Sequence, residues 1–246
     1  MIKLIAAVAM LIDHIGALLL YDYYDLRIYY NLCRMIGRIA LPLFAFCIAR
    51  GFYFSEKHGT TFKYIKNLII ISLVTQTIFT FMSYFLYGKW ELEKIELNVC
   101  FTWLISVIIL KLIASIKDIK ERRSIIAIIL IVLLFVASIF IRVEYSLYGV
   151  FYPIIFYYTL VKTDNPLFCF ILNVLNYFLF TIVEHIPVFG NTTSQIISIF
   201  TVFIIVLMKP KDKLIKMPKK FFYWFYPGQF YVLCFIKWYF FLRQRT

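Results

Sequence analysis

Long apolar runs recur along the whole chain, and they constrain its fold more than any other feature. A helix needs about 20 mostly apolar residues to cross the hydrocarbon core of a bilayer. The chain has 246 residues, of which 63% are hydrophobic and only 16% are charged. A soluble domain of this size could not bury that much apolar surface. We therefore predict an all-α polytopic transmembrane bundle that forms a single integral-membrane domain over residues 1–246.

Charge clusters divide the apolar runs into about nine predicted spans, with eight to ten as the range. Their ranges are 4–21, 30–52, 64–87, 97–116, 124–141, 145–161, 166–187, 193–208 and 220–242. We expect Pro227-Gly228 to kink or unwind the last span, because proline removes a helix hydrogen bond. Broken membrane helices usually line cavities, so this position is expected to border a site.

The charges of the loops predict the orientation of the chain in the membrane. Basic residues gather in 50–66, 111–123 and 209–220, whereas 88–97 is acidic. The positive-inside rule then places the N-terminus and the three basic loops in the cytoplasm of a multi-pass cell-membrane protein. The 26 Lys and Arg residues do not form one patch, so no nucleic-acid partner is expected. The five cysteines include no C-x-x-C pair, and no metal site is predicted.

Asp13 and His14 stand side by side in the middle of the first span. Ionisable residues at membrane depth are costly, so they usually face a protein interior and mark a functional site. Neighbouring residues on a helix diverge by about 100°, so Asp13 is not expected to orient His14 directly. Lys3 lies eleven residues earlier on the same predicted helix, about 16 Å away at ~1.5 Å per residue.

The second span carries two arginines, Arg34 and Arg38, which are expected to share one helix face. Gly37 between them would let a neighbouring helix approach closely. Two interpretations remain open. An Asp13–Arg38 ion pair would merely join the first helix to the second, whereas a cationic pocket beside His14 would hold an anionic ligand.

Several isolated polar residues also lie inside predicted spans, and for most of them a structural interhelical hydrogen bond is the alternative to a catalytic role. They are Gln76, Asn98 with Thr102, Asn173 and Asn176, and the pair Glu184-His185 at an outer end. Soluble nucleotide and hydrolase signatures, such as a P-loop or a G-x-S-x-G elbow, are absent from the sequence.

Six segments, spread in order over essentially the whole chain, resemble the TraX family of polytopic acetyltransferases. They are Asp13-His14-Ile15-Gly16, RMIGRIALPLFAFCIARGF at 34–52, Thr75-Gln76, NVCFT at 98–102, EYSLYGV at 144–150 and FYWFYPGQF at 222–230. This family is similar to a wider superfamily of membrane acyltransferases. That superfamily's basic residue, followed by ten residues and a histidine, is matched here by Lys3 and His14.

The resemblance implies transfer of an acetyl or other acyl group from cytoplasmic acyl-CoA, the donor substrate, to an acceptor amine or hydroxyl. It implies a catalytic group of His14, Asp13 and Arg38, and donor-binding residues Lys3, Arg34 and Arg50. The substrate and oxyanion residues would be Asn98, Thr102, Gln76, Tyr226 and Gln229. The family's pattern has an acid where this chain has Arg50, and a histidine where it has Gln229. An acceptor peptide such as a pilin N-terminus, a glycan and a lipid all remain open.

Two other classes of function compete with the enzyme. A transporter or flippase would use Asp13, His14 and the arginines as a proton or anion relay. The inverted repeats that many transporters contain are not visible in this sequence. A catalytically silent assembly protein is the third class.

Overall fold

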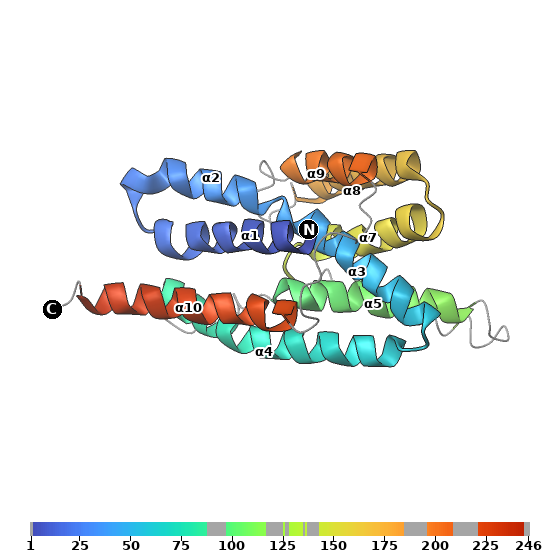
Figure 1. The fold of residues 1–246 in the computed structure, drawn as a ribbon, viewed down its shortest axis with the longest axis horizontal. Coiled ribbons are helices and arrows are strands. Elements are labelled where there is room, and N and C mark those ends of the chain that lie inside the picture. Colours follow the sequence, from blue (N-terminus) through green and yellow to red (C-terminus); the bar gives the residue numbers. More distant parts are fainter. Residues whose placement is uncertain are drawn as a thin grey trace. The chain divides into compact units, whose positions relative to one another are not determined.

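The computed structural model describes residues 2–87, 97–116, 125, 128–134, 136, 143–184, 196–208 and 221–243, and these residues are helical almost throughout (Figure 1). The α-helices are α1 (Ile2–Ile15), α2 (Arg27–Gly37), α3 (Ala40–Lys57), α4 (Thr61–Tyr87), α5 (Val99–Ile116), α7 (Ser146–Phe156), α8 (Pro166–Glu184), α9 (Ile196–Met208) and α10 (Phe221–Arg243). Shorter helical segments are η1 (Gly16–Leu20), η2 (Tyr24–Leu26) and η4 (Tyr157–Lys162). The prediction of an all-α bundle is confirmed.

Four stretches of the described residues are long and apolar enough to cross a membrane: Ile2–Leu20, Tyr24–Lys57, Thr61–Phe81 and Val99–Ile116. Two shorter apolar helices cover Pro166–Leu179 and Ile196–Met208. Large apolar side chains are exposed along one side of α8, for example Leu175, Phe178 and Leu179. Such a surface is stable when it faces lipid, which fits a membrane protein. The predicted span 124–141 falls largely outside the described residues.

The predicted span 30–52 differs from the structure, because the chain forms two helices there. α2 ends at Gly37, and α3 begins at Ala40. The N–H groups of Arg38 and Ile39 bond back to Met35 and Ile36 at 3.2 and 3.1 Å, as in a turn. The break follows directly after the two arginines: Arg34 lies in α2, and Arg38 is the C-cap residue of the same helix.

Contacts group the chain into two compact units, each built from separate stretches of sequence. The first comprises 1–44, 74–95 and 181–246, and the second comprises 45–73 and 96–180. The single-domain prediction stays a prediction.

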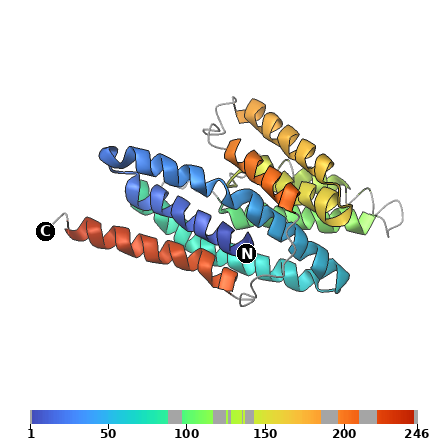
Figure 2. The same cartoon turned by 45° about the horizontal axis from the view of Figure 1, so that its top comes forward.

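In the first unit, α1 lies between α2 and α10 (Figures 1 and 2). Two glycines allow α1 and η1 to approach α2 closely. A Cβ at Gly16 would lie 2.5 Å from Cβ of Cys33, and one at Gly37 would overlap the Asp13 side chain. Small residues at helix interfaces permit such packing in membranes, as predicted for Gly37.

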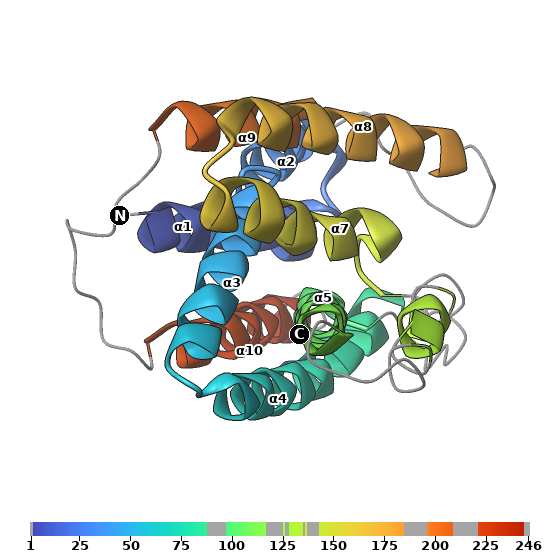
Figure 3. The same ribbon diagram turned by 90° about the vertical axis from the view of Figure 1, so that its right-hand side faces the viewer.

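In the second unit, α5 packs against α7. The chain continues from α7 through η4 and then returns as α8, which lies beside α7 (Figure 3). Asn98 caps α5, because its Oδ1 accepts the N–H of Cys100 at 3.0 Å. Asn165 caps α8 in the same way, accepting the N–H of Phe168 at 3.0 Å, and Pro166 suits the first helical position. The Asn176 amide joins α8 to α7 by donating to Tyr148 O at 3.2 Å. This last bond is the structural interhelical contact that the sequence left as an alternative.

α10 is a continuous helix from Phe221 to Arg243, with Pro227 inside it. The sequence predicted either a kink or unwinding at Pro227-Gly228; the unwinding is wrong, and the kink stays a prediction. A proline removes one helix hydrogen bond, and packing against neighbouring helices can hold the remaining turns in place.

Candidate functional site

Asp13 and His14 point to different neighbours, as the spacing on a helix predicts. Asp13 faces α2, where its Oδ1 lies 2.8 Å from Nη1 of Arg34. The two groups are in ion-pair contact without a well-directed hydrogen bond. Arg38 adds a second positive charge that acts on the Asp13 carboxylate. Asp13 thus pairs with Arg34, which lies one turn before Arg38, the partner considered from the sequence.

His14 faces α10, where aromatic rings surround it. The His14 and Phe230 ring centroids are 4.2 Å apart, and the ring of Tyr226 lies at 6.2 Å. Phe79 of α4 packs edge-on against Phe230 at 5.9 Å. Tyr226 and Phe230 are both buried. The imidazole of His14 therefore sits against an aromatic wall, away from the face that carries Asp13.

Gln229 is the polar partner that α10 offers to this histidine. Its amide lies near the His14 ring, and the residue is only 6% exposed. Nevertheless, Nε2 and Oε1 of Gln229 and Nδ1 of His14 are buried without a hydrogen bond of normal geometry. Unsatisfied buried polar atoms are rare in native structures, and they cost free energy unless a ligand or water completes them.

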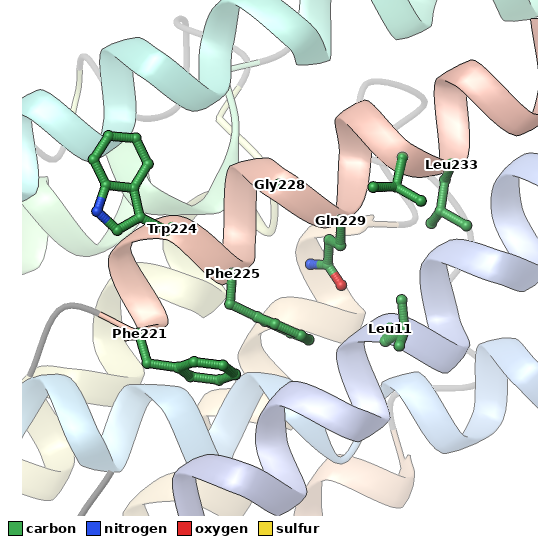
Figure 4. Close-up of a pocket in the computed structure, with 8 residues that line it drawn as sticks. Leu11, Phe221, Trp224, Phe225, Gly228, Gln229 and Leu233 are labelled. Carbon is green, nitrogen blue, oxygen red and sulfur yellow. The ribbon is translucent and has the colours of Figure 1, made fainter. Parts of the chain in front are cut away.

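A groove of about 670 Å³ opens at Gln229, between α1 and α10 (Figure 4). Leu11 lines it from α1, one helical turn before His14. From α10 the groove is lined by Phe221, Trp224, Phe225, Gly228, Gln229, Val232 and Leu233. The Gln229 amide points from α10 towards Leu11. Gly228, the position after Pro227, lines this groove although α10 is not broken there, and its place beside a functional site stays a prediction.

Two more predicted residues belong to the first unit, Lys3 and Gln76. Lys3 is exposed near the start of α1, the helix that carries His14. Gln76 is half-buried on α4, and its Nε2 donates to Oγ1 of Thr80 at 3.5 Å within the same helix. A second pocket of about 450 Å³ lies beyond the end of α1, with Tyr21, Tyr24 and Arg27 in its lining.

Three predicted residues belong to the second unit, where their contacts are structural. The Arg50 guanidinium lies 5.7 Å from the centroid of the Phe46 ring and 5.8 Å from that of Phe54. The Asn98 amide donates to Ser72 O at 3.0 Å, and the Thr102 hydroxyl donates to Glu144 O at 2.6 Å. These contacts support the structural alternative for Asn98 and Thr102 and give the oxyanion role no support.

Sequence reasoning did not single out Phe230 or Leu11. Both were within reach of simple spacing arguments. Leu11 precedes His14 by three residues and so shares its helix face. Phe230 follows Gln229 directly in the FYWFYPGQF segment. Glu184 lies at the end of α8, and no side-chain position is described for it, whereas His185 lies outside the described residues.

A family model described as "TraX protein" matches residues 1–237 of this chain. The chain belongs to the TraX family. One relative of this TraX-family chain is the "Probable fimbrial assembly protein FimC, serogroup H1" of Dichelobacter nodosus, 34% identical over 84 residues. That match covers 34% of this chain and 32% of the relative, so it spans about a third of each protein. No solved structure matches the chain. The TraX assignment extends over both units described above, including α1 and most of α10.

Proposed function

We propose that this chain is a membrane-embedded acyltransferase that moves an acyl group from cytoplasmic acyl-CoA, with acetyl-CoA as the simplest donor, to an acceptor amine or hydroxyl. One observation carries the proposal: Nδ1 of His14 and the Gln229 amide are buried together beside an apolar groove, near each other but without a hydrogen bond of normal geometry. Groups left in this state would gain from a polar ligand atom brought into the bundle. The TraX family membership supports the same chemistry.

The transfer needs one base and one hydrogen-bond donor. His14 removes the proton from the acceptor N–H or O–H, and the freed lone pair attacks the thioester carbonyl carbon. The carbon–sulfur bond breaks, and the proton held by His14 passes to the CoA sulfur, which leaves as a thiol. Nε2 of Gln229 donates a hydrogen bond to the carbonyl oxygen as negative charge develops on it.

Charged residues around α1 position this centre. The Asp13–Arg34 contact at 2.8 Å fixes α1 against α2, and Arg38 adds to it. Lys3 stands on the same helix as His14, about 16 Å from it at ~1.5 Å per residue. An exposed ammonium at that place suits the donor's phosphates, while His14 lies beside Gln229, which lines the groove.

The acceptor is expected at the other end of α1. With a cytoplasmic N-terminus, as the positive-inside rule predicts, the tyrosine-lined pocket beyond α1 would lie at the outer face. The relative from Dichelobacter nodosus carries the name of a fimbrial assembly protein. An N-terminal amine of a fimbrial or pilus subunit is therefore the acceptor that we propose first, with glycans and lipids as the other classes to be assayed.

The test is acyl transfer by the purified protein, with mass spectrometry of candidate acceptors. His14→Ala should lower turnover by about 100- to 10,000-fold, the usual contribution of a general base. His58→Ala is the matched control, because His58 is exposed directly after α3 and its Nδ1 contacts Phe54 O of that helix at 2.7 Å. Both variants should insert and fold like the parent. Wild-type turnover by His14→Ala would rule out this mechanism.

A role in assembly without catalysis is the second candidate, favoured by the name of the fimbrial relative. The two functions give opposite results in one comparison. If the chain only supports assembly, a cell carrying His14→Ala will build normal fimbriae or pili, and no acyl group will be found on their subunits with either form.

A further inference from the structure

The groove between α1 and α10 is far larger than an acetyl group requires. Its volume is about 670 Å³, and its lining is apolar apart from Gln229. Leu11, Phe225 and Leu233 form part of this lining, so a bound hydrocarbon would exchange water or lipid for close apolar contacts. The smallest acyl group would leave most of this surface without a partner.

Gln229 distinguishes between the possible apolar occupants. The residue is 6% exposed, its amide points into the groove, and neither of its polar atoms makes a hydrogen bond of normal geometry (Figure 4). A plain hydrocarbon, such as the middle of a lipid tail, would leave the amide unsatisfied in apolar surroundings, which is costly. A chain that carries a carbonyl at its end would fill the groove and also accept the hydrogen bond that Nε2 can donate.

We propose that this groove holds the hydrocarbon tail of the acyl donor, so that the preferred donor is an acyl-CoA with a chain longer than acetyl. The thioester carbonyl lies at Gln229, next to His14, and the tail lies against the α10 side chains that line the groove. This inference rests on the acyl-CoA function proposed above. It changes the expected substrate class, because a site for acetyl alone needs no groove of this size.

The kcat/KM for the acyl-CoA should therefore rise by a predictable factor with each methylene added to the acyl chain. Each methylene moved from water into an apolar site improves binding about fourfold, the ratio that corresponds to ~0.8 kcal/mol. We expect kcat/KM to rise by about this factor per methylene from acetyl-CoA through butyryl- and hexanoyl- to octanoyl-CoA. The rise should stop where the tail fills the groove.

Gly228→Leu is the variant that shortens the groove. A Cβ at Gly228 has no neighbour within 4 Å, so the new side chain fits the helix and projects into open space among the lining residues. It should lower the ratio of octanoyl- to acetyl-CoA turnover by roughly tenfold or more, since it displaces several methylenes. Phe235→Trp is the matched control, because Phe235 is 63% exposed on the same helix and does not line the groove. Its ratio should equal that of the parent.

A binding measurement separates this inference from the catalytic proposal. Trp224 lines the groove, so an acyl-CoA with bromine on its tail should quench its fluorescence, and Trp224→Phe should lose that part of the quenching. If acetyl-CoA is turned over but the chain-length series is flat, the groove proposal is overturned and the proposed function stands. If no acyl-CoA is turned over but Trp224 is quenched, donor binding stands and the catalytic proposal fails. Quenching by brominated phospholipid alone, or full competition by CoA without an acyl chain, would assign the groove to membrane lipid or to the pantetheine arm and overturn the inference.

Discussion

Gly37 allows α1 and α2 to pack closely because it has no side chain. A Cβ at this position would overlap the Asp13 side chain, so Gly37→Ala should push the two helices apart and weaken the Asp13–Arg34 contact. Overpacking of this kind typically costs about 1–3 kcal/mol. Thermal unfolding of the protein in detergent should show a clearly lower midpoint.

Gly228→Ala is the natural control for this change. It also replaces a helical glycine, but its Cβ would meet no atom within 4 Å. Alanine is favoured over glycine inside a helix by about 1 kcal/mol. The midpoint should therefore stay the same or rise. Equal losses in both variants would show that helix propensity, and not contact with Asp13, decides the effect.

At the scale of elements, the junction of α5 with α7 depends on Thr102. Its hydroxyl donates to Glu144 O at 2.6 Å, and Gly149 of α7 lies against its methyl group. Thr102→Val keeps the shape and removes the hydroxyl, so stability should fall by about 1 kcal/mol. Acyl transfer per folded molecule should not change. A large loss of turnover at unchanged stability would instead restore the predicted oxyanion role of this residue.

The positions of the helices and the contact of the first helix with the second could be predicted, whereas the contact of α1 with α10 could not. Apolar length and charge clusters located the described helices to within several residues. The break after Gly37 was missed, because the apolar pattern continues through it into α3. The pairing of His14 with Gln229 and Phe230 joins residues more than 200 positions apart. No local period in the sequence reports which helices pack together, so only the family resemblance brought Gln229 into the candidate site.

For the whole molecule, the lysine and arginine distribution predicts one topology. Reporter fusions in 50–66, 111–123 and 209–220 should all report the cytoplasm, and fusions in 88–97 should report the outside. In the structure the first of these predicted loops is reduced to a turn at 58–60, and its other residues belong to α3 and α4. A cytoplasmic signal from 88–97 would reverse the bundle. Transfer from a cytoplasmic donor to an outer acceptor would then fail, even if the chemistry at His14 were right.

The different directions taken by Asp13 and His14 have a consequence for the evolution of this chain. Residue 13 contacts α2 through Arg34, whereas residue 14 contacts α10 through Gln229. Adjacent codons are therefore under separate selection. Among relatives, changes at 13 should accompany changes at 34, whereas 14 should stay histidine wherever acyl transfer is kept, with either histidine or glutamine at 229. An aligned set of TraX sequences should show the covarying pair 13 and 34, and weaker coupling between positions 13 and 14 despite their shared peptide bond.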